Sequence, residues 1–135
     1  MRKDLNYYLV DFENVHGNGL SIEHELTSKD HVVIFYTDHS KTVNLESLEA
    51  LGGSAEVSFK KVPSGRQSVD MHIVSYMGYQ IGIYRDRIKI VIVSEDSDFD
   101  KPIRFWKEKG YDVSKQSALS QTSEDTKENE NERTF

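Results

Sequence analysis

Four aspartates of this chain stand where an apolar segment ends or a helical pattern begins: Asp11, Asp70, Asp96 and Asp98. In an open parallel α/β sheet the carboxyl ends of the strands lie along one edge, so acids from distant parts of the chain can meet there. Carboxylates gathered without matching cations repel each other, and such a cluster usually serves to hold a divalent metal. The pattern therefore indicates metal-dependent phosphodiester chemistry.

The segment 94–100 gives the strongest signal, because three acids at alternate positions follow an aliphatic run. Alternate acids that leave a rigid strand can share one centre, and Mg²⁺ is usually held by one or two carboxylates with waters and substrate phosphate. The alternative is helix capping, in which Ser97 or Asp98 caps the next helix and the helix dipole favours the acids. Capping accounts for one or two of the acids. An EF-hand is disfavoured because its glycine and terminal glutamate spacing are missing.

The other two acidic segments have simple alternatives of their own. Asp11 is followed by Asn14, which would orient a water or a phosphate oxygen, although a polar turn that satisfies backbone groups explains both residues as well. Ser68 is expected to be the N-cap of a long helix. Asp70 would then be the second helical residue, where the dipole favours an acid even without metal.

Basic and aromatic side chains offer further candidates for contacts to a nucleic acid. The candidate phosphate contacts are Arg66 and Lys101, with Lys60 and Lys61 as further cations on the rim. Cations on loops are equally explained as solvated surface. Five tyrosines are predicted to pack in or near the core, although one or two could stack on a base: Tyr7, Tyr8, Tyr76, Tyr79 and Tyr84. The five histidines lack a paired metal-ligand spacing, and the glycines form neither a P-loop nor a dinucleotide fingerprint.

Hydrophobic patterns predict five strands alternating with four helices. The strands are expected over 5–12, 31–37, 55–62, 87–94 and from 111 onward. The helices are expected after Ser21, after Asn44, over 68–84, and over a segment that carries Phe99, Ile103 and Trp106 and ends at Gly110. The strand 55–62 stops at Pro63 and alternates, so it should be half-exposed near an edge. This alternation predicts an α/β fold with a mostly parallel sheet and right-handed crossovers.

Length and composition are consistent with one domain over residues 1–116 and an acidic tail over 117–135 that is predicted to be disordered. The net charge is −6, and the tail, with five acids and two bases, carries half of it. Because four body acids are proposed metal ligands, a bound divalent ion would bring the body close to neutral, and RNA is not excluded. The absence of cysteine excludes disulfides and thiolate metal sites. No secretory signal or membrane-length apolar run is present, and a cytoplasmic location is predicted.

Taken together, the segment 8–14, Asp70 and the segment 94–99 resemble the motifs of the NYN branch of the PIN-like ribonucleases, in family order and spacing, over about residues 5–116. The resemblance implies a three-layer α/β/α fold with a central parallel sheet and Mg²⁺- or Mn²⁺-dependent hydrolysis of RNA. It implies that the metal-binding acids are Asp11, Asp70, Asp96 and Asp98, with Asn14 as a polar helper. Two residues depart from the family pattern. Glu95 stands where many relatives carry glycine, and Asp100 is a further acid.

The resulting hypothesis is endonucleolytic cleavage of single-stranded or locally unpaired RNA, in which divalent ions activate a water and no protein nucleophile is needed. One alternative is a catalytically weak PIN-like module that binds RNA or a protein. Another is a metal-dependent phosphatase, although the nucleophilic aspartate and later lysine of such an enzyme are not evident. A homodimer is also expected, because a parallel sheet with an exposed edge can pair with another chain.

Overall fold

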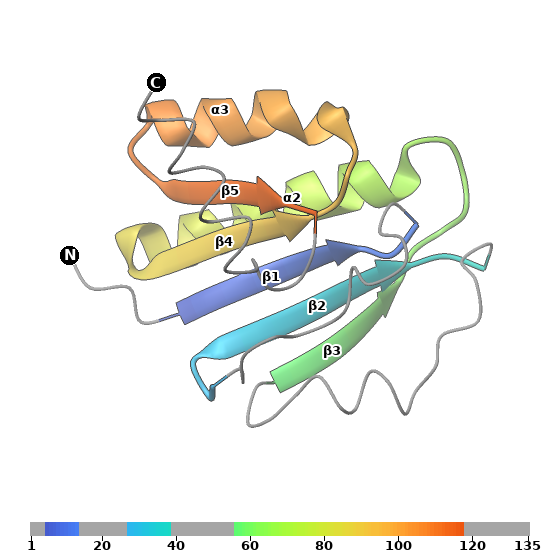
Figure 1. The fold of residues 1–135 in the computed structure, drawn as a ribbon, viewed down its shortest axis with the longest axis horizontal. Coiled ribbons are helices and arrows are strands. Elements are labelled where there is room, and N and C mark those ends of the chain that lie inside the picture. Colours follow the sequence, from blue (N-terminus) through green and yellow to red (C-terminus); the bar gives the residue numbers. More distant parts are fainter. Residues whose placement is uncertain (1–4, 14–26, 39–55, 118–135) are drawn as a thin grey trace, which may run out of the picture.

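The computed structural model describes residues 5–13, 27–38 and 56–117, and these residues form a five-stranded sheet. The strands are β1 (Leu5–Asp11), β2 (Asp30–Tyr36), β3 (Glu56–Lys61), β4 (Ile88–Val93) and β5 (Asp112–Gln116). They are ordered β3-β2-β1-β4-β5, every neighbouring pair is parallel, and all five arrows in Figure 1 point the same way. The predicted α/β fold with a five-stranded parallel sheet is therefore confirmed.

Within the described residues, two α-helices and two short 3₁₀ turns connect β3 to β4 and β4 to β5. They are α2 (Ser68–Tyr84), η1 (Arg85–Arg87), η2 (Ser97–Phe99) and α3 (Asp100–Glu108). Helix α2 buries Val69, Ile73, Met77 and Ile81, which recur every four residues and therefore lie on one side of the helix. Burying an aliphatic side chain of this size contributes about 1.5–3 kcal/mol, so this stripe fixes the helix against the sheet. The predicted helix is confirmed, and it ends at Tyr84 as predicted.

Both helices pack on the same face of the sheet. Ile73 of α2 and Ile103 of α3 belong to one buried cluster with Leu9 of β1 and Ile92 of β4. Helix α3 ends as predicted next to Gly110, whose φ of +93° lets the chain turn into β5 at little steric cost.

The opposite face of the sheet is also apolar and buried. Val10, Val32, Ile34 and Val93 are each 0% exposed. The central strands are therefore covered on both faces, which explains their nearly continuous aliphatic sequences. The helices predicted after Ser21 and Asn44 lie outside the described residues, as does the predicted tail. Strand β3 lies at one edge and is half-exposed, as predicted.

The start of α2 differs from the prediction. Ser68 is the first helical residue and not the N-cap, which is Gln67, and Gln67 makes no side-chain capping bond. A tight turn replaces the hydroxyl cap: the Ser68 N–H donates to the Gly65 carbonyl at 3.1 Å, and Gln67 has a left-handed φ of +62°. Asp70 is consequently the third helical residue and not the second. Among the described residues, no helix has the length and apolarity to cross a bilayer.

Candidate metal centre

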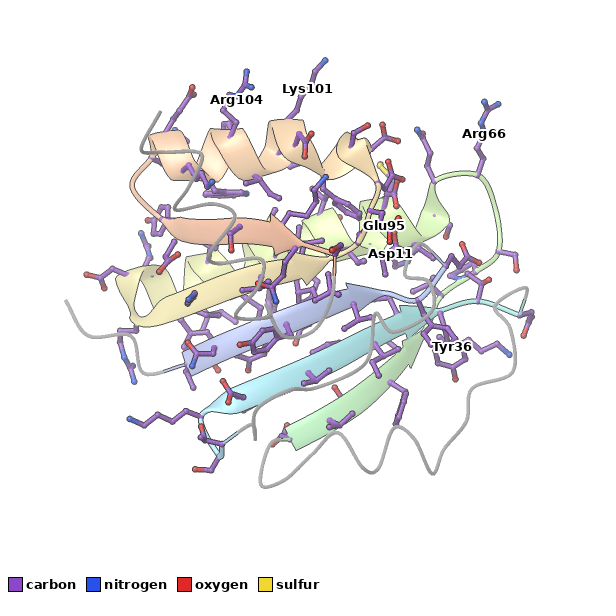
Figure 2. All side chains as sticks on the ribbon, in the orientation of Figure 1. Asp11, Tyr36, Arg66, Glu95, Lys101 and Arg104 are labelled. Carbon is purple, nitrogen blue, oxygen red and sulfur yellow. The ribbon has the colours of Figure 1, made fainter. Side chains whose placement is uncertain are left out.

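Asp11 lies at the carboxyl end of the central strand β1 and is 0% exposed (Figure 2). The register of β1 and β4 pairs Val10 with Val93, which brings Asp11 next to Ser94. The buried Ser94 hydroxyl donates to Asp11 Oδ2 at 3.0 Å. Because burying a carboxylate is costly unless its charge is compensated, this position is expected to be matched by cations or strong donors.

Asp96 follows β4 and is tied to Asp11 through the same serine. Its backbone N–H donates to Ser94 Oγ at 3.0 Å, and its own Oδ1 accepts a hydrogen bond from the Asp98 N–H at 2.9 Å. Capping therefore does occur in this segment, but not in the form of the alternative in which Ser97 or Asp98 caps the next helix, because the N-cap of α3 is Phe99. Asp96 is the N-cap of η2, because its carboxylate accepts the hydrogen bond from the Asp98 N–H.

The first turn of α2 brings Asp70 to the same point. One carboxylate oxygen from each of Asp11, Asp70 and Asp96 lies within 4.8 Å of the other two. Oxygens that share one ion at metal–oxygen distances of 2.0–2.6 Å lie up to about 4–5 Å apart, so this spacing fits a single divalent ion. An all-carboxylate set of hard oxygen ligands suits Mg²⁺ or Mn²⁺.

Burial and the mutual repulsion of the carboxylates in this group raise the pKa of Asp70. The pKa of Asp70 is raised from 3.8 to about 7, first by burial and then by the negative charges of Asp96 and Asp11. A hydrogen bond with Asp96 and the charge of Asp98 raise this pKa further. A divalent cation among the three acids would lower the pKa of Asp70, because an opposite charge favours the ionised carboxylate.

The remaining acidic candidates stand apart from these three. Asp98 is exposed, and its carboxylate is not part of the three-oxygen group, although its charge reaches Asp70. Glu95 is exposed and is not part of the three-oxygen group. Asp100 pairs with Lys115 at 2.9 Å. Asn14 lies outside the described residues.

Lys115 is a residue of this site that the sequence did not reveal. From β5, its ammonium group donates to the Asp96 carbonyl at 3.1 Å and also pairs with the Asp100 carboxylate. Its side chain is only 23% exposed, so both contacts are partly shielded from water. Lys115 thus holds the backbone of the segment that carries Asp96. The importance of Ser94 was likewise missed, although its place directly after the β4 run was a usable signal.

The two predicted phosphate contacts do not reach the acids. Arg66 lies on the loop before α2 and Lys101 on α3, and both are exposed. Figure 2 shows both side chains extending away from Asp11. Any role for them is therefore with more distant phosphates of a bound strand.

Comparison with known families agrees with this geometry. A family model for the PIN domain matches residues 5–116, and the chain belongs to the PIN domain family. No curated protein and no solved structure matches the chain. PIN domains are generally nucleases with a cluster of acidic residues and generally use divalent metal ions. Asp11, Asp70 and Asp96 form such a cluster here.

Proposed function

We propose that this protein is a divalent-metal-dependent ribonuclease of the NYN branch of the PIN-like family that cuts RNA internally. The observation that carries the proposal is the convergence of three carboxylate oxygens, from β1, α2 and the segment after β4, within 4.8 Å of one another. Their residues fall at the motif positions on which the NYN resemblance rests. A family whose members are generally nucleases supports the same conclusion.

In this proposal Asp11, Asp70 and Asp96 hold Mg²⁺ or Mn²⁺. A divalent ion bound there supplies Lewis acidity, which activates a water for attack and stabilises negative charge on phosphate oxygens. Ser94 keeps Asp11 and Asp96 in place through its two hydrogen bonds. Asp98 is proposed to act from the exposed rim of the group. No side chain forms a covalent bond to the substrate.

Further proposed contacts concern the substrate and a second subunit. Asn14 is proposed to orient the scissile phosphate, and Arg66 and Lys101 to contact phosphates farther along the strand. We also propose a homodimer, which the half-exposed edge strand β3 supports. Sedimentation equilibrium would contradict the dimer by showing a single monomeric species at high protein concentration.

The ribonuclease proposal is tested with an end-labelled single-stranded RNA and with Mn²⁺, Mg²⁺ or EDTA. Asp96→Asn keeps the volume of the side chain but removes its charge, and Glu108→Gln changes an exposed carboxylate at the end of α3. Metal-dependent cleavage by the wild type and by Glu108→Gln, with a loss of at least about 100-fold for Asp96→Asn, is expected.

Two other results would redirect the proposal. No cleavage by folded wild-type protein in any lane would favour a module that only binds RNA or protein. Equal cleavage by wild type and Asp96→Asn would place the activity outside the three-acid group. Release of phosphate from a small phosphate ester, without RNA cleavage, would identify a phosphatase instead.

A further inference from the structure

A second surface lies beside the metal group, in a groove between α2 and the edge strand β3. The groove encloses about 500 Å³ and is open to solvent. The residues that line it come from β2, from the end of β3 with the residue that follows it, and from α2: Phe35, Lys60, Lys61, Val62, His72, Ser75, Tyr76 and Tyr79. We call this surface the β3–α2 groove.

The aromatic side chains of the groove form a firm wall with one exposed ring. Tyr76 is half-buried and packs edge-on against Phe35, with the ring centroids 5.7 Å apart. Tyr79 lies one helical turn farther along α2 and is 66% exposed. An exposed ring held on a helix beside a packed aromatic pair offers a flat surface on which an unpaired base can stack.

The polar side chains of the groove are basic or neutral. Lys60 places its ammonium group 5.4 Å from the centre of the Tyr76 ring, and Lys61 pairs with Asp38. His72 is exposed, and its Nδ1 lies 2.7 Å from the Ser68 carbonyl. Because a carbonyl oxygen only accepts, Nδ1 is the donor in that contact, and Nε2 of the neutral ring is left as an acceptor. Of the described residues that line the groove, none is an acid. The groove therefore complements a negatively charged ligand.

The sheet register places this groove close to the metal group. Asp11 pairs with Phe35 across β1 and β2, and Phe35 pairs with Lys60 across β2 and β3. With neighbouring strands about 4.8 Å apart, the backbone at Lys60 lies roughly 10 Å from the backbone at Asp11. Figure 2 shows Tyr36, the next residue of β2, at the same edge of the sheet as Asp11. A strand of a few nucleotides can span this distance.

We propose that the β3–α2 groove binds a single-stranded segment of the RNA substrate adjacent to the scissile phosphate. A base stacks on Tyr79, and a nearby phosphate lies against the ammonium group of Lys60. The choice of ligand rests on the ribonuclease function proposed above. Because stacking needs a base that is free of a partner base, the groove selects unpaired RNA over duplex RNA.

The test measures binding without cleavage. Fluorescence anisotropy of a labelled single-stranded RNA is recorded in EDTA for wild type, Tyr79→Ala and Lys60→Gln. Tyr79→Ala is expected to raise Kd roughly 5- to 100-fold, the range that loss of one base–aromatic stack gives. Lys60→Gln is expected to raise Kd several-fold and to reduce the dependence of Kd on salt concentration. A duplex of the same length should bind more weakly and respond little to Tyr79→Ala.

A matched pair on α3 provides the control. Lys109 lies 4.9 Å from the centre of the ring of Phe105, which is 50% exposed, so this pair repeats the cation–aromatic chemistry away from the groove. Phe105→Ala and Lys109→Gln are expected to bind RNA as wild type does. Thermal melting checks that all four variants are folded.

Each outcome decides the proposal. Weakened binding confined to Tyr79→Ala and Lys60→Gln supports the groove, whereas equal weakening by all four variants, or by none, overturns it. Failure of wild type to bind single-stranded RNA in EDTA also overturns it, as would preferential binding of duplex RNA. The cleavage assay with metal is read separately, so metal-dependent cleavage without groove effects would retain the nuclease and remove only the groove.

Discussion

The crowding of carboxylates makes a quantitative prediction for Asp70 in the absence of metal. The pKa of Asp70 rises from 3.8 to about 7 in the folded protein because of burial and the charges of Asp96 and Asp11. At 1.36 kcal/mol per pH unit, this rise sets an upper limit of about 4 kcal/mol. Since Asp70 is only partly buried, solvent screening reduces the expected effect to about 1–2 kcal/mol.

The sign follows from proton linkage. A carboxyl with a raised pKa binds its proton more tightly in the folded state, so folding stability falls as the pH rises from about 4 to about 7. Asp70→Asn cannot ionise and removes this loss. In EDTA at pH 8 we therefore expect Asp70→Asn to be more stable than wild type by about 1–2 kcal/mol, a rise in Tm of roughly 3–10 °C.

Addition of Mn²⁺ should reverse the order. A ligand at 100 times its Kd stabilises the folded state by about 2.7 kcal/mol, and only the wild type keeps all three carboxylates. Urea unfolding from pH 4 to pH 8, with EDTA and with Mn²⁺, measures both effects, and Glu108→Gln should follow the wild type. Two results would contradict this prediction: a lower free energy of unfolding for Asp70→Asn than for the wild type in EDTA at pH 8, or a wild-type free energy of unfolding that does not change between pH 4 and 7.

Three further predictions concern the residues around the acids and the long helix. Ser94→Ala removes the hydrogen bonds to Asp11 and Asp96. It should therefore destabilise the fold by about 1–3 kcal/mol and weaken Mn²⁺ binding 10- to 100-fold. An unchanged Mn²⁺ affinity in calorimetric titration would contradict this. Lys115→Met should lower the cleavage rate with a change in stability below about 2 kcal/mol, since Lys115 holds the Asp96 carbonyl; a wild-type rate would show that the contact is unimportant. Gly82→Ala should stabilise the protein by about 0.5–1 kcal/mol, because alanine favours the helix more than glycine does and the added Cβ meets no atom of the surrounding structure within 4 Å. A lower midpoint of urea unfolding would contradict this.

Much of the fold could be predicted from the sequence, because the hydrophobic residues recur with the period of a strand or a helix. The aliphatic run of β4 and the four-residue repeat of α2 each specify one type of element, and strands that alternate with helices leave a parallel sheet as the simple arrangement. The N-terminal boundary of α2 was less accurate. Ser68 has the chemistry of an N-cap, but a backbone turn with a left-handed Gln67 starts the helix instead. Ser64 and Gly65 signal a turn, but glutamine does not signal a left-handed conformation.

The three acids of the site could be predicted from the sequence, because two stand at strand ends and Asp70 stands at the start of a helical pattern. Asp11 is the last residue of β1 and Asp96 follows the neighbouring parallel strand β4, so their proximity follows from the sheet order. The contacts of Lys115 and the base-stacking surface proposed at Tyr79 depend instead on which side chains meet across elements. Such contacts are set by tertiary packing within a few ångströms. Helix α2 carries several tyrosines, and the sequence alone does not distinguish an exposed one from a packed one. The structure distinguishes them by exposure.

The central claim is that Asp11, Asp70 and Asp96 together hold one divalent ion. Anomalous diffraction from crystals grown with Mn²⁺ tests it most directly, because the manganese signal locates the ion independently of the protein atoms. We expect a peak within about 2.0–2.6 Å of a carboxylate oxygen from each of the three residues. A peak bound elsewhere, or none at this group in crystals that contain Mn²⁺ at millimolar concentration, would contradict it.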